Sequence, residues 1–212
     1  MFREEDHERD EKGRFKRKGK SLEAADLQEE LAEEPKYIPV TPITDEAIER
    51  VPFVDIPGYT KEECEEITRQ HKELLRYARA HNSHGEVAFV FRDGLKDRKI
   101  FKGTDNDIDF GYALTGRGSL MVILHNHPRN KSFSLNDVLV LLKSDELKTL
   151  SIVKNNGEVE VITKSDNFDS NIAFRVLQRN IKKYVKSKTN AEYEKVISKT
   201  LTDKEVNTIW KK

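Results

Sequence analysis

The chain has 212 residues, of which 36% are charged and 36% hydrophobic, and its acidic and basic side chains balance to a formal net charge of zero. This composition allows one modest hydrophobic core, and it excludes a global charge that would steer the protein to nucleic acid or to an acidic membrane. The single cysteine, Cys64, excludes an intramolecular disulfide framework and a zinc site built from several cysteines.

The N-terminal sequence and the hydrophobic runs predict where the protein is located. The first residues contain no apolar segment of the kind found in secretory signal peptides. No stretch approaches the roughly 20 apolar residues that a membrane-spanning helix needs. A lone cysteine also suits a reducing compartment. We therefore expect a cytoplasmic protein that has no membrane partner.

Residues 1–36 are almost entirely charged or small. A segment with so few large apolar side chains cannot bury enough surface to offset the entropy cost of folding, so the sequence predicts a disordered tail. Basic residues gather at 12–20 around Phe15, a pattern that could contact phosphate groups or an acidic partner. Residues 37–59 follow, and their Pro and Ile/Val content predicts an extended linker.

The periodicity of apolar residues predicts an α/β (α+β) domain over residues 60–166, with a mixed sheet flanked by helices. Thr60 and Glu63 form a capping-box signature, and the apolar residues after them recur at helical spacing, which predicts a helix over 60–81. Short apolar runs predict strands at 87–91, 99–102, 120–124, 150–153 and 159–162.

The remaining elements are predicted from turn and capping signals. A second helix begins at Ser134, and Asn-Asn-Gly at 155–157 joins the last two strands as a hairpin. Residues 167–212 are helical in pattern and rich in lysine, which predicts a helical C-terminal extension. A capping-box pattern at Thr202 and Glu205 predicts one more helix start near the end.

Cys64 and His71 lie on the apolar stripe of the helix predicted at 60–81. A thiol and an imidazole at such positions are more often buried packing groups than a nucleophile or a ligand. We therefore expect both side chains to be structural.

Two histidines follow the strand predicted at 120–124. In extended backbone, residues i and i+2 point to the same side, so the imidazoles of His125 and His127 are expected to face one point. Pro128 ends the strand there, and Asp137, in the first turn of the next helix, can turn its carboxylate back to that point. Two imidazoles and one carboxylate are a common ligand set for catalytic Zn²⁺, with a fourth position left for water.

The proton of a zinc-activated water needs a carboxylate base. Glu86 precedes the strand predicted at 87–91, and a carboxylate at the edge of a neighbouring strand could reach such a water without binding the metal. Glu86 is therefore the candidate base.

The order of these residues resembles the signature of the JAB/MPN (JAMM) metalloproteases. The sequence His-Asn-His-Pro is most similar to the RadC-like and phage-associated bacterial branches of that family. The resemblance covers about residues 60–163. The positions that carry it are Glu86, His125, His127, Pro128, Ser134 and Asp137.

This resemblance implies a role for each residue. It implies that His125, His127 and Asp137 bind zinc. It implies that Glu86 is the general acid/base, and that the hydroxyl of Ser134 hydrogen-bonds the oxyanion that develops on the scissile carbonyl. Members of the family hydrolyse peptide or isopeptide bonds, several of them on ubiquitin-like modifiers, so the implied substrate is a peptide or a ubiquitin-like protein.

Parts of the motif also have simpler interpretations. Ser134 and Asp137 alone make a capping box, which is a structural device that needs no metal. A His-x-His pair at a strand end is often held by ordinary hydrogen bonds. The letters His-Asn-His also match the name of the HNH nucleases, but the residues of that motif are spread over a ββα hairpin, so this interpretation is set aside.

Three functions follow from these observations. The first is a Zn²⁺-dependent hydrolase of peptide or isopeptide bonds. The second is a non-catalytic assembly module of the same fold, as in phage head morphogenesis, which docks partners through its N-terminal tail and C-terminal helices; a phage-encoded protein of this kind would be virion-associated. The third is a RadC-like protein associated with nucleic acid, which the basic cluster at 12–20 favours.

Overall fold

The structure is a computed structural model that describes residues 39–92, 94–104, 108 and 121–212. The tail predicted at 1–36, with its basic cluster, lies outside these residues.

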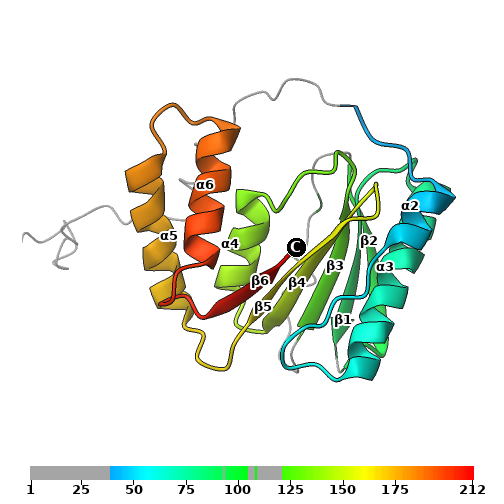
Figure 1. Ribbon diagram of the computed structural model, residues 1–212, viewed down its shortest axis with the longest axis horizontal. Coiled ribbons are helices and arrows are strands. Elements are labelled where there is room, and N and C mark those ends of the chain that lie inside the picture. Colours follow the sequence, from blue (N-terminus) through cyan, green and yellow to red (C-terminus); the bar gives the residue numbers. More distant parts are fainter. Residues whose placement is uncertain (1–38, 93, 105–107, 109–120) are drawn as a thin grey trace, which may run out of the picture. The chain divides into compact units, whose positions relative to one another are not determined.

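A six-stranded mixed sheet forms the centre of the described structure (Figure 1). The strand order is β2-β1-β3-β4-β5-β6. Strands β3 and β4 run parallel, and every other neighbouring pair is antiparallel. The strands are β1 (Val87–Arg92), β2 (Asp97–Lys102), β3 (Met121–His127), β4 (Leu147–Lys154), β5 (Val159–Lys164) and β6 (Thr208–Lys211).

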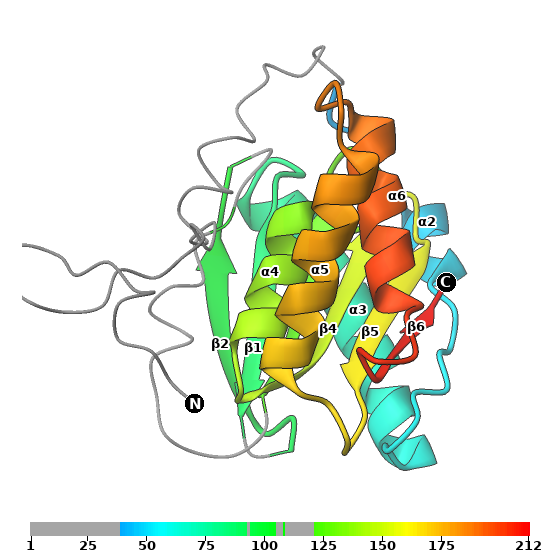
Figure 2. The same cartoon turned by 90° about the vertical axis from the view of Figure 1, so that its left-hand side faces the viewer.

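Helices cover both faces of this sheet. Figures 1 and 2 show α2 and α3 on one face and α4, α5 and α6 on the other. The predicted fold class is thereby confirmed as a mixed α/β fold. No helix in the described part of the chain is long and apolar enough to cross a membrane. The helices are α2 (Asp45–Arg50), α3 (Lys61–His81), α4 (Leu135–Lys143), α5 (Ser170–Tyr184) and α6 (Asn190–Leu201).

Because both faces of the sheet are covered, β1 is buried without alternation. Val87, Phe89 and Phe91 belong to the core that also contains side chains of α3. Ala88 and Val90 point to the opposite face, and they are buried as well. A continuous apolar run of this kind is typical of a strand between two layers of helices.

The connection from β3 through α4 to β4 determines where functional side chains gather. Two parallel strands need a crossover connection, and α4 provides it on one face of the sheet. The C-terminal end of β3 and the N-terminal end of α4 therefore meet at one edge of the sheet. Crevices at the carboxyl ends of strands are the usual ligand sites of open α/β sheets.

The linker predicted as extended at 37–59 contains a helix, so this part of the prediction was wrong. Residues 45–50 form α2, whose N-cap Thr44 accepts a hydrogen bond from the backbone N–H of Ala47. Ala47 and Ile48 are buried. Tertiary burial and one cap therefore stabilise a helix that is too short to form alone.

The C-terminal extension predicted as helical at 167–212 is helical in α5 and α6, but it ends in strand β6, which pairs with β5. Thr202 is the C-cap of α6 and does not begin a further helix. The capping-box prediction at Thr202 and Glu205 was therefore wrong.

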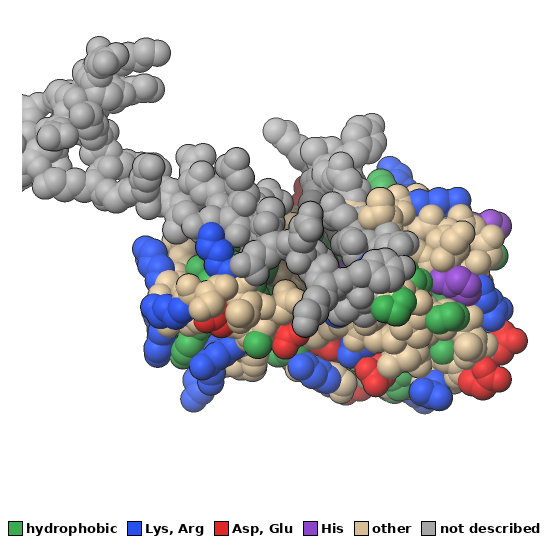
Figure 3. Space-filling view, turned by 90° about the horizontal axis from the view of Figure 1, so that it is seen from above, with side chains coloured by type: hydrophobic (Ala, Val, Ile, Leu, Met, Phe, Trp, Pro, Cys, Tyr) green, Lys and Arg blue, Asp and Glu red, His purple; other side chains and the backbone are tan. Residues whose placement is uncertain are grey.

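Charge is unevenly distributed over the described surface. Figure 3 shows Lys and Arg side chains gathered at the end formed by α5 and α6, whereas basic and acidic side chains are mixed at the end beside α2 and α3. The exposed basic residues of α5 and α6 are Arg175, Arg179, Lys182, Lys183, Lys195 and Lys199.

Candidate metal centre

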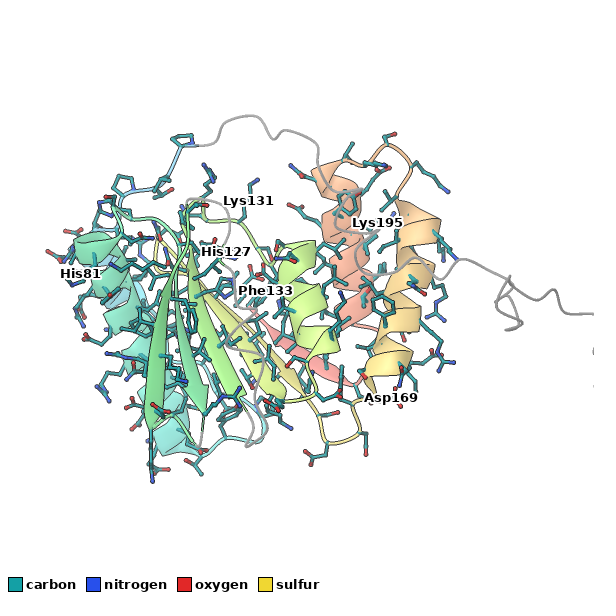
Figure 4. All side chains as sticks on the ribbon, turned by 180° about the vertical axis from the view of Figure 1, so that it is seen from behind. His81, His127, Lys131, Phe133, Asp169 and Lys195 are labelled. Carbon is teal, nitrogen blue, oxygen red and sulfur yellow. The ribbon has the colours of Figure 1, made fainter. Side chains whose placement is uncertain are left out.

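The imidazoles of His125 and His127 meet at the end of β3. Their Nε2 atoms are 3.0 Å apart. Val122 and Leu124 point into the core beneath α3, so the alternation of the strand places both histidines on the face that α4 covers, as predicted. Figure 4 marks His127 at this end of the sheet, close to Lys131 and Phe133 of the loop that leads to α4.

Two carboxylates flank this pair of imidazoles. In Asp137, Oδ1 lies 3.2 Å from Nε2 of His125, and Oδ2 lies 3.5 Å from Nε2 of His127. Oε1 of Glu86 lies 3.8 Å from Nε2 of His125. Glu86, His125 and His127 each offer a ligand atom, and these three atoms all lie within 4.8 Å of one another. The structure therefore brings together the two imidazoles and both predicted carboxylates.

The spacing of these atoms fits a small divalent cation. Tetrahedral zinc with ligands at about 2.0–2.1 Å keeps its ligand atoms roughly 3.3 Å apart. The two Nε2 atoms are 3.0 Å apart, and each has a different oxygen of Asp137 at 3.2 or 3.5 Å, which brackets that value. Since two imidazole lone pairs repel each other at such a distance, a proton or a metal ion has to lie between the rings.

Burial and local charge determine the protonation of the site. Burial lowers the pKa of His125 although the Asp137 carboxylate acts in the opposite direction. Burial also opposes protonation of His127, but its contacts with Asp137 and the charge of Glu86 outweigh burial and raise its pKa. Burial works to raise the pKa of Asp137, yet the two imidazoles hold it well below its usual range. These pKa directions favour a proton shared by His127 and Asp137, which metal binding would have to displace.

The outer nitrogen of the His127 imidazole is oriented by the backbone. Nδ1 of His127 lies 2.9 Å from the carbonyl oxygen of Lys131, and because a carbonyl only accepts, Nδ1 is the donor. In the neutral ring of His127 the lone pair is then on Nε2, the atom that faces the site. Metal-binding histidines are usually oriented in this way.

Ser134 lies beside the site, and the structure confirms its capping interpretation. Oγ of Ser134 donates to Oδ2 of Asp137 at 2.6 Å, and the backbone N–H of Ser134 donates to the same oxygen at 2.7 Å. The N–H of Asp137 donates in return to Oγ at 3.1 Å. The capping box therefore aims the carboxylate of Asp137 at the histidines. The role of Ser134 as an oxyanion donor stays a prediction, because its hydroxyl proton is directed to Asp137 here.

Asn126 is a residue of the site that the sequence reasoning missed. Its Oδ1 accepts from the N–H of Val87 at 2.7 Å, and its Nδ2 donates to the carbonyl of Gly85 at 3.1 Å and to Oδ1 of Asn155 at 2.8 Å. Asn126 therefore fixes the backbone on both sides of Glu86. The position of Asn126 between the two histidines could have predicted this role. Strand alternation turns its side chain to the opposite face of the sheet, and an amide buried there needs hydrogen-bond partners.

Cys64 and His71 are buried, as predicted. Nε2 of His71 lies 2.9 Å from Oγ of Ser151 in strand β4. Both groups belong to the α3 layer and contribute no ligand atom to the cluster described above.

Comparison of the chain with protein-family models, with curated proteins and with solved structures gave no significant match. The fold and the geometry of the site alone define the class: a mixed α/β protein with a buried candidate metal centre of histidines and carboxylates.

Proposed function

We propose that this protein is a Zn²⁺-dependent hydrolase of peptide or isopeptide bonds, of the JAB/MPN type that its motif resembles. One observation carries the proposal. Side chains from the start of β1, the end of β3 and the first turn of α4 converge in a buried cluster of two imidazoles and two carboxylates. Burying so many titratable groups is costly unless a cation compensates them, so this arrangement supports a metal site with a function.

The distances suggest how the roles are divided. His125, His127 and Asp137 would hold the ion, because each imidazole nitrogen has an oxygen of Asp137 within 3.5 Å. Bound zinc supplies Lewis acidity, which polarises a carbonyl and lowers the pKa of water to about 7. Glu86, whose Oε1 lies 3.8 Å from Nε2 of His125, is farther from that nitrogen than Asp137 is and suits proton transfer better than ligation.

In the proposed reaction, Oε1 of Glu86 accepts a proton from the attacking water and then delivers it to the leaving nitrogen. The side chain of Ser134 is exposed at the edge of the site. If its hydroxyl turns from Asp137 to the developing oxyanion, the stabilisation expected of such a donor is about 2.7–4 kcal/mol.

A protein substrate also needs a docking surface. The exposed Lys and Arg side chains of α5 and α6 offer a surface suited to an acidic partner. The C-terminal helices would then take part in docking, whether the partner is a substrate or a component of an assembly.

The proposal is tested by incubating the zinc-loaded, full-length protein with panels of peptides and isopeptide-linked conjugates. We expect cleavage by the wild type, none by Glu86→Gln, and wild-type cleavage by Glu65→Gln, a matched change of an exposed glutamate in α3. A zinc-loaded wild type that cleaves no member of either panel would contradict the hydrolase and favour the assembly module. Salt-dependent binding to DNA or RNA without cleavage would favour the RadC-like function.

A further inference from the structure

We propose that Ser132, held by the buried carboxylate of Glu160, is a positioning residue for His127 in the metal centre. This inference rests on the metal site of the proposed function. Oγ of Ser132 donates to Oε2 of Glu160 at 2.7 Å. The preceding residue, Lys131, provides the carbonyl oxygen that accepts from Nδ1 of His127 at 2.9 Å. A single peptide unit therefore connects the imidazole to the hydroxyl of Ser132.

Glu160 is a fixed point of the sheet. It lies in β5, is 3% exposed and pairs across the sheet with Ile152, which in turn pairs with His125. Nζ of Lys154 lies 3.1 Å from Oε1 of Glu160, and Nε1 of Trp210 donates to Oε2 at 3.2 Å. A buried carboxylate is tolerated only when it is paired and hydrogen-bonded, and this one has three partners from three segments.

The loop between β3 and α4 depends on a few directional contacts. On one side of Lys131, the N–H of Asn130 donates to the carbonyl of His127, and Nδ2 of Asn130 donates to Oγ1 of Thr41. On the other side, the described polar contact of the Ser132 side chain is the one with Glu160. Phe133 buries its ring, but apolar packing does not orient a peptide plane. Ser132 therefore sets the direction of the carbonyl that orients His127.

Orientation of an imidazole by its outer nitrogen typically contributes 10–100-fold to metal affinity, as an order of magnitude. Without the Ser132 hydroxyl, the peptide unit between Lys131 and Ser132 can rotate and its carbonyl no longer fixes the imidazole of His127. Nε2 of His127 is then less often directed at the metal. We therefore expect Ser132 to act on zinc affinity more than on the stability of the fold.

The experiment measures the zinc affinity of the full-length protein by competition with a chromophoric chelator. Ser132→Ala is expected to weaken binding about 10–100-fold, and Ser132→Thr, which keeps the hydroxyl, is expected to restore it. Trp210→Phe is the matched control, because it removes the other hydrogen bond to the same oxygen of Glu160 and lies outside the loop. We expect Trp210→Phe to stay within about twofold of the wild type, since Lys154 and Ser132 still hold the carboxylate.

Thermal unfolding of the metal-free variants separates positioning from stability. A merely structural hydrogen bond would lower the melting temperature in Ser132→Ala and Trp210→Phe alike and leave both zinc affinities unchanged. That result, or an equal loss of affinity in the two variants, would overturn the inference while the metal site stands. A wild type that binds no zinc would instead overturn the proposed function, and the inference with it.

Discussion

His71 is an enclosed imidazole in α3, and acidification of the metal-free protein should reveal its effect on stability. It is 1% exposed, and Nε2 lies 2.9 Å from Oγ of Ser151. Burial lowers the pKa of His71 from 6.5 to about 3, and the nearby His125 acts in the same direction. The unfolded chain therefore binds a proton at this residue over a pH range in which the folded protein does not.

The direction and size of the effect follow from this difference. Between pH 6.5 and about pH 3 the unfolded state binds more protons at His71, so the free energy of unfolding falls as the pH falls through this range. Above pH 6.5 the residue has no effect. At about 1.4 kcal/mol per unit, the expected loss is about 2 kcal/mol at pH 5 and about 4 kcal/mol at pH 3, where the folded protein also begins to bind the proton.

Urea unfolding at pH 7 and pH 5, in the presence of a chelator, tests this expectation. Between these two pH values the wild type should lose about 2 kcal/mol more than His71→Gln, because glutamine does not titrate. His81→Gln, which changes an exposed histidine at the end of the same helix, should keep the wild-type pH dependence. Equal pH dependence in the wild type and His71→Gln would refute the reasoning.

Three further predictions concern the candidate metal centre. Asp137→Asn should weaken zinc binding more than about 100-fold, and Glu86→Gln less than about 10-fold, in chelator competition; an equal loss would make Glu86 a ligand. Asn126→Leu should lower the free energy of unfolding in urea by about 2–6 kcal/mol, because it leaves the N–H of Val87 and the carbonyl of Gly85 buried and unpaired. An unchanged midpoint of urea unfolding would contradict this. Zinc binding at pH 6 should release at least about one proton, measured by calorimetry in buffers of different ionisation enthalpy; no release would contradict the shared proton.

Local patterns in the sequence predicted the parts of the fold that depend on neighbouring residues. The start of α3 follows from Thr60 and Glu63, whose capping box is present in the structure. The common face of His125 and His127 follows from strand alternation. The turn at 155–157 was predicted from its residue types, but its glycine also has a tertiary reason: a Cβ at Gly157 would lie 2.2 Å from the carbonyl oxygen of Ala47.

The features that were missed depend on contacts between distant residues. Helix α2 is stabilised by burial against the rest of the protein, which its short sequence does not reveal. Strand β6 (Thr208–Lys211) forms because β5 offers an edge, and its four residues are too few to show a periodicity of their own. The contacts of Asn126 with the backbone around Glu86, and of Ser132 with Glu160, join segments 28–41 positions apart. Spacing within a single segment carries no signal for such contacts.

X-ray absorption spectroscopy of the zinc-loaded, full-length protein tests the metal centre most directly. We expect a first shell of nitrogen and oxygen ligands at about 2.0–2.1 Å, with the outer-shell scattering of two imidazoles. In His127→Ala one imidazole should disappear from the spectrum or the zinc should be lost, whereas His84→Ala should match the wild type. A sulfur ligand at about 2.3 Å, or a spectrum without imidazole scattering, would place the metal elsewhere and contradict the account.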